Sequence, residues 1–275
     1  MKRITQLFAV IASAAALACG GAAQEQGSSA EVDVLTYDPV VTSQSLSDVA
    51  LKFPWELDNP TAQKAGVGKI TWTLTIDGEA PVSGETVAGV DAAAGAKANG
   101  AIEVKAPLST TEEAFAAHAK KPGLRYTLAA RLNVASGTNQ EDFEAEWHGE
   151  IFGPRKPKVK LKAEAGRYGD RSFELNFLIS LVNPNPFPVT VDGLEYTLFV
   201  NDVQISKDLL ASNRQIDPSS ELQFDVQRFI GKDDLQDLAN AMMGMKIIPY
   251  HLNGTLKVQG IDIAAPIKGE ITFAR

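Results

Sequence analysis

The sequence has little of what disulfide-bonded proteins and many enzymes are built on: it holds one cysteine, three histidines and 7% aromatic residues among 275. One cysteine forms no disulfide within the chain, so a fold outside the cytoplasm would depend on core packing alone. It also leaves no cysteine set for a zinc site. The motifs of serine hydrolases, phosphate-binding loops and dinucleotide-binding turns are missing as well. We therefore expect no catalytic, cofactor-binding or metal-binding residues.

Basic residues are outnumbered, with 26 lysines and arginines against 34 acidic residues and a net charge of −8. Because a phosphate backbone repels an acidic surface, nucleic acid is not an expected partner. Hydrophobic residues make up 44% and charged residues 22% of the chain, which is the mixture of an ordinary globular protein. The length favours two domains of about 100 to 150 residues each.

The apolar run at the start of the chain is short for a membrane span. Residues 7–18 are too few to cross roughly 30 Å of hydrocarbon as a helix, and two basic residues precede them, so residues 1–18 are typical of an export signal. The end of this run resembles a bacterial lipobox, which implies that Cys19 carries lipid. An ordinary signal peptide with an incidental cysteine is the alternative. Residues 19–30 are rich in Gly, Ala, Gln and Ser and predict a flexible tether.

The two halves of the chain are similar to each other at a constant shift of 124 residues. Residues 51–60, LKFPWELDNP, align with residues 175–184, LNFLISLVNP. At the same shift, residues 70–78, ITWTLTIDG, align with residues 194–202, LEYTLFVND. One offset through separated blocks indicates a duplicated unit.

Further along, the shift between the halves changes. Gly149 aligns with Gly269 at a shift of 120, which predicts a hairpin loop four residues longer in the first half. The period is far longer than that of solenoid repeats, so each unit is expected to close its own core. The sequence therefore predicts two domains, residues 31–153 and residues 154–275.

Alternating apolar residues predict antiparallel strands with one buried face. In residues 70–76, Ile, Trp, Leu and Ile alternate with three threonines. Tight turns are expected where residues tolerate a positive φ. These turns are Asp77-Gly78, Asn201-Asp202 and Gln259-Gly260.

One helix is expected in each half. Residues 109–121 begin with hydroxyl cap candidates and two glutamates and end in lysines before Pro122. Residues 232–245 space leucines and methionines along one helical face, which we interpret as packing. Each helix is expected to lie over a β-sandwich.

Residues 183–188, Asn-Pro-Asn-Pro-Phe-Pro, interrupt a strand-like run. Proline has no N–H to give a sheet ladder, so three prolines in six residues indicate a sheet edge or a break between strands. The side chains of Asn183 and Asn185 are suited to satisfy exposed backbone groups nearby. We interpret the motif as a device that ends a strand and protects its edge.

Together with the hairpin that follows, this stretch resembles the signature of the water-stress and hypersensitive-response (WHy) domain of the late embryogenesis abundant (LEA) type 2 family. The resemblance implies a mainly β fold of two tandem fibronectin-III-like antiparallel β-sandwiches, each with one short helix. It also implies no catalytic residues and a role in protection during desiccation or other stress. The motif residues, all structural, are Asn183, Pro184, Asn185 and Pro186 in the second half and Asn59 and Pro60 in the first.

One strand of the second half has a regular cationic face. Lys156, Lys158, Lys160 and Lys162 alternate with apolar residues and proline. Such a face could contact anionic lipid headgroups or polysaccharide. Protection of a sheet edge is the other interpretation, because lysine is a favoured residue there.

The remaining polar residues give no clear site. His118, His148 and His251 belong to separate blocks of sequence, so we expect no histidine-based site. Asp142, Glu144 and Glu146 alternate along one strand, and we interpret them as its solvent face.

These features indicate an exported, lipid-anchored, non-enzymatic protein of the cell envelope that acts in stress protection or scaffolding. Its expected partners are the membrane, through the N-terminal lipid, and an envelope protein or glycan. Gly20 after Cys19 favours the periplasmic face of the outer membrane under the rule of lipoprotein sorting. The alternatives are a binding module for an envelope protein, glycan or anionic lipid, and an enzyme with a site assembled from scattered residues.

Overall fold

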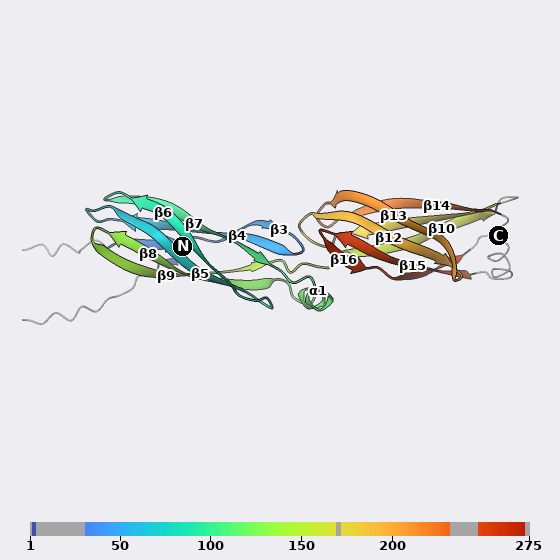
Figure 1. The fold of residues 1–275 in the computed structure, drawn as a ribbon, viewed down its shortest axis with the longest axis horizontal. Helices are drawn as coiled ribbons and strands as arrows, with labels where there is room; N and C mark the ends of the chain where they lie inside the picture. Colours follow the sequence, from blue (N-terminus) through green and yellow to red (C-terminus); the bar gives the residue numbers. More distant parts are fainter. Residues whose placement is uncertain (1, 4–30, 169–171, 232–246, 273–275) are drawn as a thin grey trace, which may run out of the picture. The chain divides into compact units, whose positions relative to one another are not determined.

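The computed structural model describes residues 2–3, 31–168, 172–231 and 247–272. The expected lipidation site Cys19, with its export signal and tether, and the second expected helix lie outside the described residues. The described chain consists mostly of strands, and every strand pair is antiparallel (Figure 1). This confirms the mainly β fold class.

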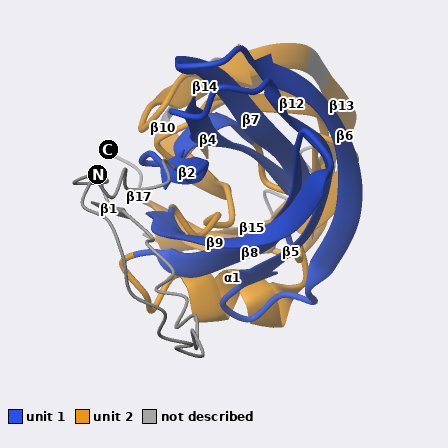
Figure 2. Cartoon of the chain, turned by 90° about the vertical axis from the view of Figure 1, so that its left-hand side faces the viewer, with its two compact units in different colours: residues 1–44, 48–108, 123–151 blue, residues 45–47, 109–122, 152–275 orange. Residues whose placement is uncertain are grey.

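The chain divides into two compact units, coloured in Figure 2. Unit 1 consists of residues 1–44, 48–108 and 123–151, and unit 2 of residues 45–47, 109–122 and 152–275. Two short segments of the first half are therefore part of unit 2. The domain boundaries expected from the sequence repeat stay a prediction.

Unit 1 contains two sheets packed around one core. The strands of the first sheet are β1 (Lys2–Arg3), β2 (Asp33–Thr36), β3 (Val40–Gln44), β4 (Asp48–Asn59) and β7 (Ala96–Pro107), and those of the second are β5 (Ala65–Ile76), β6 (Val82–Ala92), β8 (Leu124–Ser136) and β9 (Asn139–Ile151). Their orders are β1-β2-β4-β3, with β7 also paired to β4, and β6-β5-β8-β9. Phe53 of β4 meets Tyr126 and Trp147 of the second sheet edge-on, both at 5.9 Å between ring centroids. These contacts join the two sheets.

Unit 2 is built in the same way. Its first sheet contains β10 (Lys158–Tyr168), β11 (Ser172–Val182) and β14 (Glu221–Gly231), and its second contains β12 (Val189–Val200), β13 (Val203–Ile216), β15 (Ile247–Val258), β16 (Ile261–Ala264) and β17 (Ile267–Thr272). The orders are β10-β11-β14 and β13-β12-β15-β16, with β17 also paired to β15. Alternate residues of β11, from Leu175 to Leu181, are buried in the core of this unit.

The two units pair equivalent strands in the same register. Leu57 lies opposite Ala98 in unit 1, and Leu181 lies opposite Leu222 in unit 2, 124 residues further along both strands. Because a slip of one residue would turn every side chain to the wrong face, a shared register requires the same pattern of buried positions in both halves. The sequence repeat is therefore also a repeat of strand pairing.

An aromatic contact also recurs at this shift. The edge-on pair of Phe53 and Tyr126 is matched by Phe177 and Tyr250, whose ring centroids lie 5.6 Å apart. Across the strand pair, each tyrosine lies against a glycine, Gly149 in unit 1 and Gly269 in unit 2. A Cβ atom at either glycine would lie 2.3 Å from the tyrosine hydroxyl oxygen. The close approach explains why both positions are glycine.

A hairpin loop four residues longer was expected in the first half, but the four extra residues lengthen the paired strands and not the loop. Beyond the pair of Val134 and Glu141, two more pairs form, Ala135 with Gln140 and Ser136 with Asn139, and the turn itself holds two residues, 137–138. Val258 of β15 pairs with Ile261 of β16, which also leaves two. The difference of four residues explains why the shift changes from 124 to 120.

The expected turns and the first expected helix are present. The turn residues Gly78, Asn201, Asp202, Gln259 and Gly260 have φ values of +88°, +47°, +64°, +50° and +76°. The helix α1 spans Glu112–His118 and belongs to unit 2. Its N-cap hydroxyl, on Thr111, accepts a hydrogen bond from the backbone nitrogen of Ala114 at 3.2 Å.

Candidate functional site: buried asparagines and a row of lysines

A buried asparagine lies at the end of the same strand in both units. Asn59 is the last residue of β4 and Asn183 directly follows β11, and both are 0% exposed. The side-chain nitrogen of Asn183 donates to the backbone oxygens of Phe187, Ile216 and Asp217 at 2.8, 3.2 and 3.1 Å. One amide therefore ties the β11–β12 loop to the end of β13.

The same three bonds occur 124 residues earlier. The side-chain nitrogen of Asn59 donates to the backbone oxygens of Gln63, Ala92 and Ala93 at 2.8, 3.1 and 3.0 Å. We call each asparagine with its three carbonyl partners an asparagine bracket. A buried backbone carbonyl without a donor is costly, so the bracket satisfies groups that the turn takes out of the sheet ladder.

A second asparagine extends the bracket of unit 2. The side-chain oxygen of Asn183 accepts hydrogen bonds from the backbone and side-chain nitrogens of Asn185 at 3.0 and 3.1 Å. Asn185 in turn exchanges two hydrogen bonds with the backbone of Arg155, at 2.7 and 2.9 Å, and so holds the segment that leads into β10. In unit 1 the corresponding residue is Thr61, whose backbone nitrogen and hydroxyl donate to the side-chain oxygen of Asn59 at 3.2 and 2.7 Å.

The prolines lie in the same turns. Pro184 and Pro186 fall in the segment between β11 and β12, where the strand breaks, and Pro60 follows β4 directly. The two asparagines of unit 2 were expected to serve exposed backbone groups. Both are 0% exposed, and their partners are backbone groups of the buried residues Phe187 and Ile216 and of the more exposed residues Asp217 and Arg155. Their polar atoms are engaged with the chain itself, so the motif fixes the shape of this end of the unit.

Three of the four expected lysines share one face of β10. Lys158, Lys160 and Lys162 are exposed, and the residues between them are half-buried against the core of unit 2. Lys156 lies before the strand, is half-buried, and pairs with Glu112 of α1. β10 is also the outer strand of its sheet, as protection of an edge would require. The sequence pattern did not show that Lys156 is engaged elsewhere, because its partner is 44 residues away.

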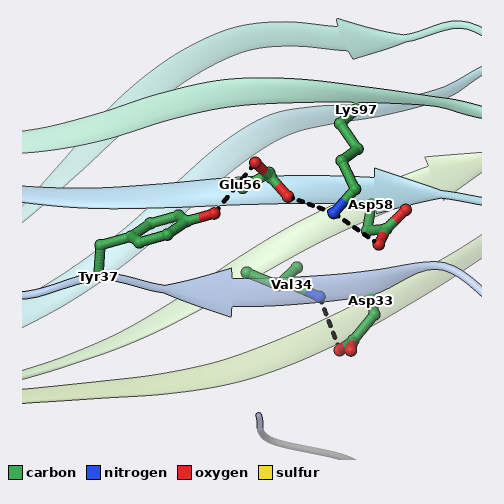
Figure 3. Close-up of polar contacts among 6 residues, drawn as sticks. All are labelled: Asp33, Val34, Tyr37, Glu56, Asp58 and Lys97. Atoms are coloured by element: carbon green, nitrogen blue, oxygen red, sulfur yellow. Dashed lines mark hydrogen bonds and ion pairs between the residues drawn. The ribbon is translucent and has the colours of Figure 1, made fainter. Parts of the chain in front are cut away.

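A cluster of charged side chains lies on β4 and β7 of unit 1 (Figure 3). The nitrogen of Lys97 lies 2.6 Å from Glu56 and 3.0 Å from Asp58, and the hydroxyl of Tyr37 donates to Glu56 at 3.0 Å. The hydrogen bond from Lys97, and then that from Tyr37, hold the pKa of Glu56 below its ordinary value. The bonds to Glu56 and Asp58 raise the pKa of Lys97. Sequence alone did not indicate this cluster, since its members come from β4, β7 and the residue that follows β2.

The histidines are not brought together into one site. His118 is buried on α1, His148 bonds Thr127 from β9 with 3.1 Å between the ring nitrogen and the hydroxyl, and His251 of β15 stacks on Phe199. Among the residues that the structure describes, no group of three or more His, Cys, Asp or Glu side chains could hold a metal ion.

The alternating acids of β9 lie on its exposed face, as expected, and two of them have partners on β8. Arg131 lies 3.1 Å from Glu144, and the amide of Asn133 donates to Asp142 at 2.8 Å. A hollow of about 780 Å³ lies beside them on β5, β6, β8 and β9. It is lined mainly by hydroxyl groups, small residues and the pair of Arg131 and Glu144, and it is wide open to solvent.

The geometry thus defines a β-sandwich protein whose signature residues hold its turns. A family model described as late embryogenesis abundant protein matches residues 178–270, which are 93 of the 275 residues and lie within unit 2. The match confirms the resemblance of this part of the chain to the LEA type 2 family. No curated protein matches the chain.

Two solved structures show a weak likeness. A protein from Archaeoglobus fulgidus is 18% identical, with 42% of this chain and 97% of that chain covered and a TM-score of 0.31. Red sea bream transglutaminase is 11% identical, with 89% of this chain and 31% of that chain covered and a TM-score of 0.30. Such scores support no conclusion about activity. Within the described residues, no helix is long and apolar enough to cross a membrane.

Proposed function

We propose that the chain is a non-enzymatic, lipid-anchored envelope protein of the WHy type that protects the cell during drying or other water stress. The observation that carries the proposal is the engagement of the signature asparagines. In both units these buried side chains are bonded to the chain's own backbone, so they serve a stable shape and leave no reactive group at the motif. The family match over residues 178–270 supports the same class of function.

Attachment through Cys19 fits this role, because a protein held at the envelope meets osmotic and drying stress directly. An acyl anchor of more than one chain binds a bilayer stably, whereas one chain alone binds only marginally. The periplasmic face of the outer membrane is the proposed location. Scaffolding of other envelope components is compatible with the same anchoring.

A binding module is the second candidate, and the row of lysines on β10 favours it. Three exposed ammonium groups on one strand face are suited to an anionic envelope component. Binding of an anionic envelope component and stress protection are compatible, since binding would hold a protective protein at its site of action.

The experiment for the first candidate is survival of a deletion strain. We expect the strain to lose viability after drying and rehydration and after osmotic shock, to grow normally otherwise, and to regain survival when the full chain is returned. Equal survival of the deletion strain and its parent would overturn the proposal. A broad hydrolase screen of the full chain tests the enzymatic alternative, and reproducible turnover would contradict a non-enzymatic role.

A further inference from the structure

The outer face of the three-stranded sheet in unit 2 has an ordered charge distribution. Lys158, Lys160 and Lys162 occupy β10, and neutral residues lie opposite them on the central strand β11. The residues opposite these on β14 are Glu221, Gln223 and Asp225. Residues directly paired across strands project to the same face. One face thus has cations along one outer strand and carboxylates along the other.

The lysines of β10 are less neutralised than those of unit 1. The five lysines at positions 52, 64, 69, 97 and 105 each have a carboxylate oxygen within 4.0 Å. On β10 only Lys160 has such a partner among the described residues, and Glu221 lies 3.8 Å from it. In a protein with a net charge of −8, such a row of cations is an exception.

The shape of the row favours a chain-like anion over a flat one. Alternate residues of a strand are about 6.8 Å apart, so the ammonium groups form a line roughly 14 Å long. The backbone of β14 lies two strand spacings away, about 9.6 Å, but the side chain of Glu221 reaches back to within 3.8 Å of Lys160. A polymer lying along β10 therefore meets Lys158 and Lys162, which have no carboxylate partner among the described residues, and Lys160, which it shares with Glu221. A flat anionic bilayer pressed on this face would meet the carboxylates as well.

The chemistry of the row favours phosphate. Lysine binds phosphate oxygens as a point charge, so a line of lysines can contact successive phosphates of a chain without the planar bidentate geometry by which arginine recognises carboxylates and phosphates alike. All three positions are lysine. We propose that the face of Lys158, Lys160 and Lys162 binds a single linear phosphate-rich polymer that lies along β10. This proposal rests on the second candidate function, the binding module, and names its ligand; the survival assay tests stress protection separately, so failure of one does not decide the other.

The test uses the full chain with Cys19→Ala, so that lipid plays no part, and fluorescently labelled inorganic polyphosphate as the probe. Binding is followed by fluorescence anisotropy as the salt concentration is varied. With about 0.7 counterions released per phosphate contact, three contacts predict a slope of roughly −2 for the logarithm of affinity against the logarithm of salt concentration. We expect the Lys158→Gln, Lys160→Gln, Lys162→Gln triple variant to lose at least tenfold in affinity and most of this slope.

A charge-matched control separates a site from general attraction. The Lys52→Gln, Lys69→Gln, Lys105→Gln variant also changes the net charge from −8 to −11, by removal of three lysines, but leaves β10 intact. It should bind polyphosphate like the parent chain. Thermal unfolding of both variants verifies that they fold. Equal losses in both variants, no loss in the β10 variant, or no binding of polyphosphate by the parent would overturn the proposal. So would tighter binding to phosphatidylglycerol vesicles than to polyphosphate, which would identify a membrane surface as the partner.

Discussion

Replacement of the bracket asparagines by alanine tests whether these side chains hold the fold. Asn183→Ala removes the donor to three backbone oxygens and the acceptor for two nitrogens of Asn185. Asn59→Ala removes the same three donor bonds in unit 1 and the acceptor for the backbone nitrogen and hydroxyl of Thr61. Since the bonds correspond one to one, the two substitutions should destabilise their units by similar amounts.

The magnitude follows from the groups left without partners. Each buried polar group that loses its partner costs about 1 to 3 kcal/mol, and relaxation of the turn with entry of water recovers part of this. We expect a loss of about 3 kcal/mol in the free energy of unfolding of the affected unit. With a urea slope of about 2 kcal/mol per molar, the midpoint of that unit falls by roughly 1.5 M. A unit of ordinary stability stays folded without denaturant.

The chain offers a natural probe for the assay. Its three tryptophans, Trp55, Trp72 and Trp147, all lie in unit 1, so their fluorescence during urea unfolding reports that unit. Far-ultraviolet circular dichroism reports strands of both units. Asn59→Ala should move the fluorescence transition, and Asn183→Ala should move the dichroism transition attributable to unit 2.

Asn253→Ala is the matched control, because Asn253 is an exposed asparagine on β15 of unit 2. It should change stability by no more than about 0.5 kcal/mol. If Asn59→Ala and Asn183→Ala were as mild as this control, the bracket would not be a structural requirement and the reasoning would be refuted.

Three further predictions follow from particular contacts. Gly149→Ala and Gly269→Ala should each lower the free energy of unfolding in urea by about 1 to 3 kcal/mol, because the new Cβ atom displaces a buried tyrosine ring. Gly68→Ala, with open space around it, should lower it little, and equal effects of all three substitutions would contradict this packing. The pKa of Glu56 is lowered in the folded state, so its contribution to stability is present above the ordinary pKa of 4.5 and is lost as the pH falls through the folded pKa. The melting temperature should therefore drop more steeply on acidification in the parent chain than in Glu56→Gln. Parallel curves of melting temperature against pH would contradict this prediction. Cys19→Ala should move the chain from the membrane to the soluble fraction without changing its melting temperature, and retention on the membrane would show that lipid is not the anchor.

More of the fold than of the surface contacts could be predicted from the sequence. Period-2 alternation, turn residues and an internal shift of 124 residues are local or repetitive signals, and they indicated the strands and the tight turns correctly. They also located the hairpin that differs between the halves, although its four extra residues extend the strands and not the loop. The bracket of Asn183 was visible only as a motif, because its partners Ile216 and Asp217 are more than 30 residues away. That all three motif asparagines, Asn59, Asn183 and Asn185, are buried became clear only in the structure.

The features that could not be predicted from the sequence depend on side-chain contacts between residues far apart in the chain. Lys156 fits the alternation of the strand that follows, yet it pairs with Glu112. The cluster around Glu56 contains a bond between residues 41 positions apart, Glu56 and Lys97, and no local pattern marks it. The lysine row was predicted from spacing, but that Lys160 alone of its three exposed lysines has a carboxylate partner among the described residues depends on which residues of β11 and β14 lie opposite.

Hydrogen exchange at the side-chain amides of Asn59 and Asn183, followed by NMR, tests the central claim that these residues are committed to shape. Their protons are buried and bonded to backbone oxygens, so we predict exchange far slower than that of the exposed Asn253 amide, approaching the rate at which the whole unit opens. Exchange as fast as that of Asn253 would contradict the account.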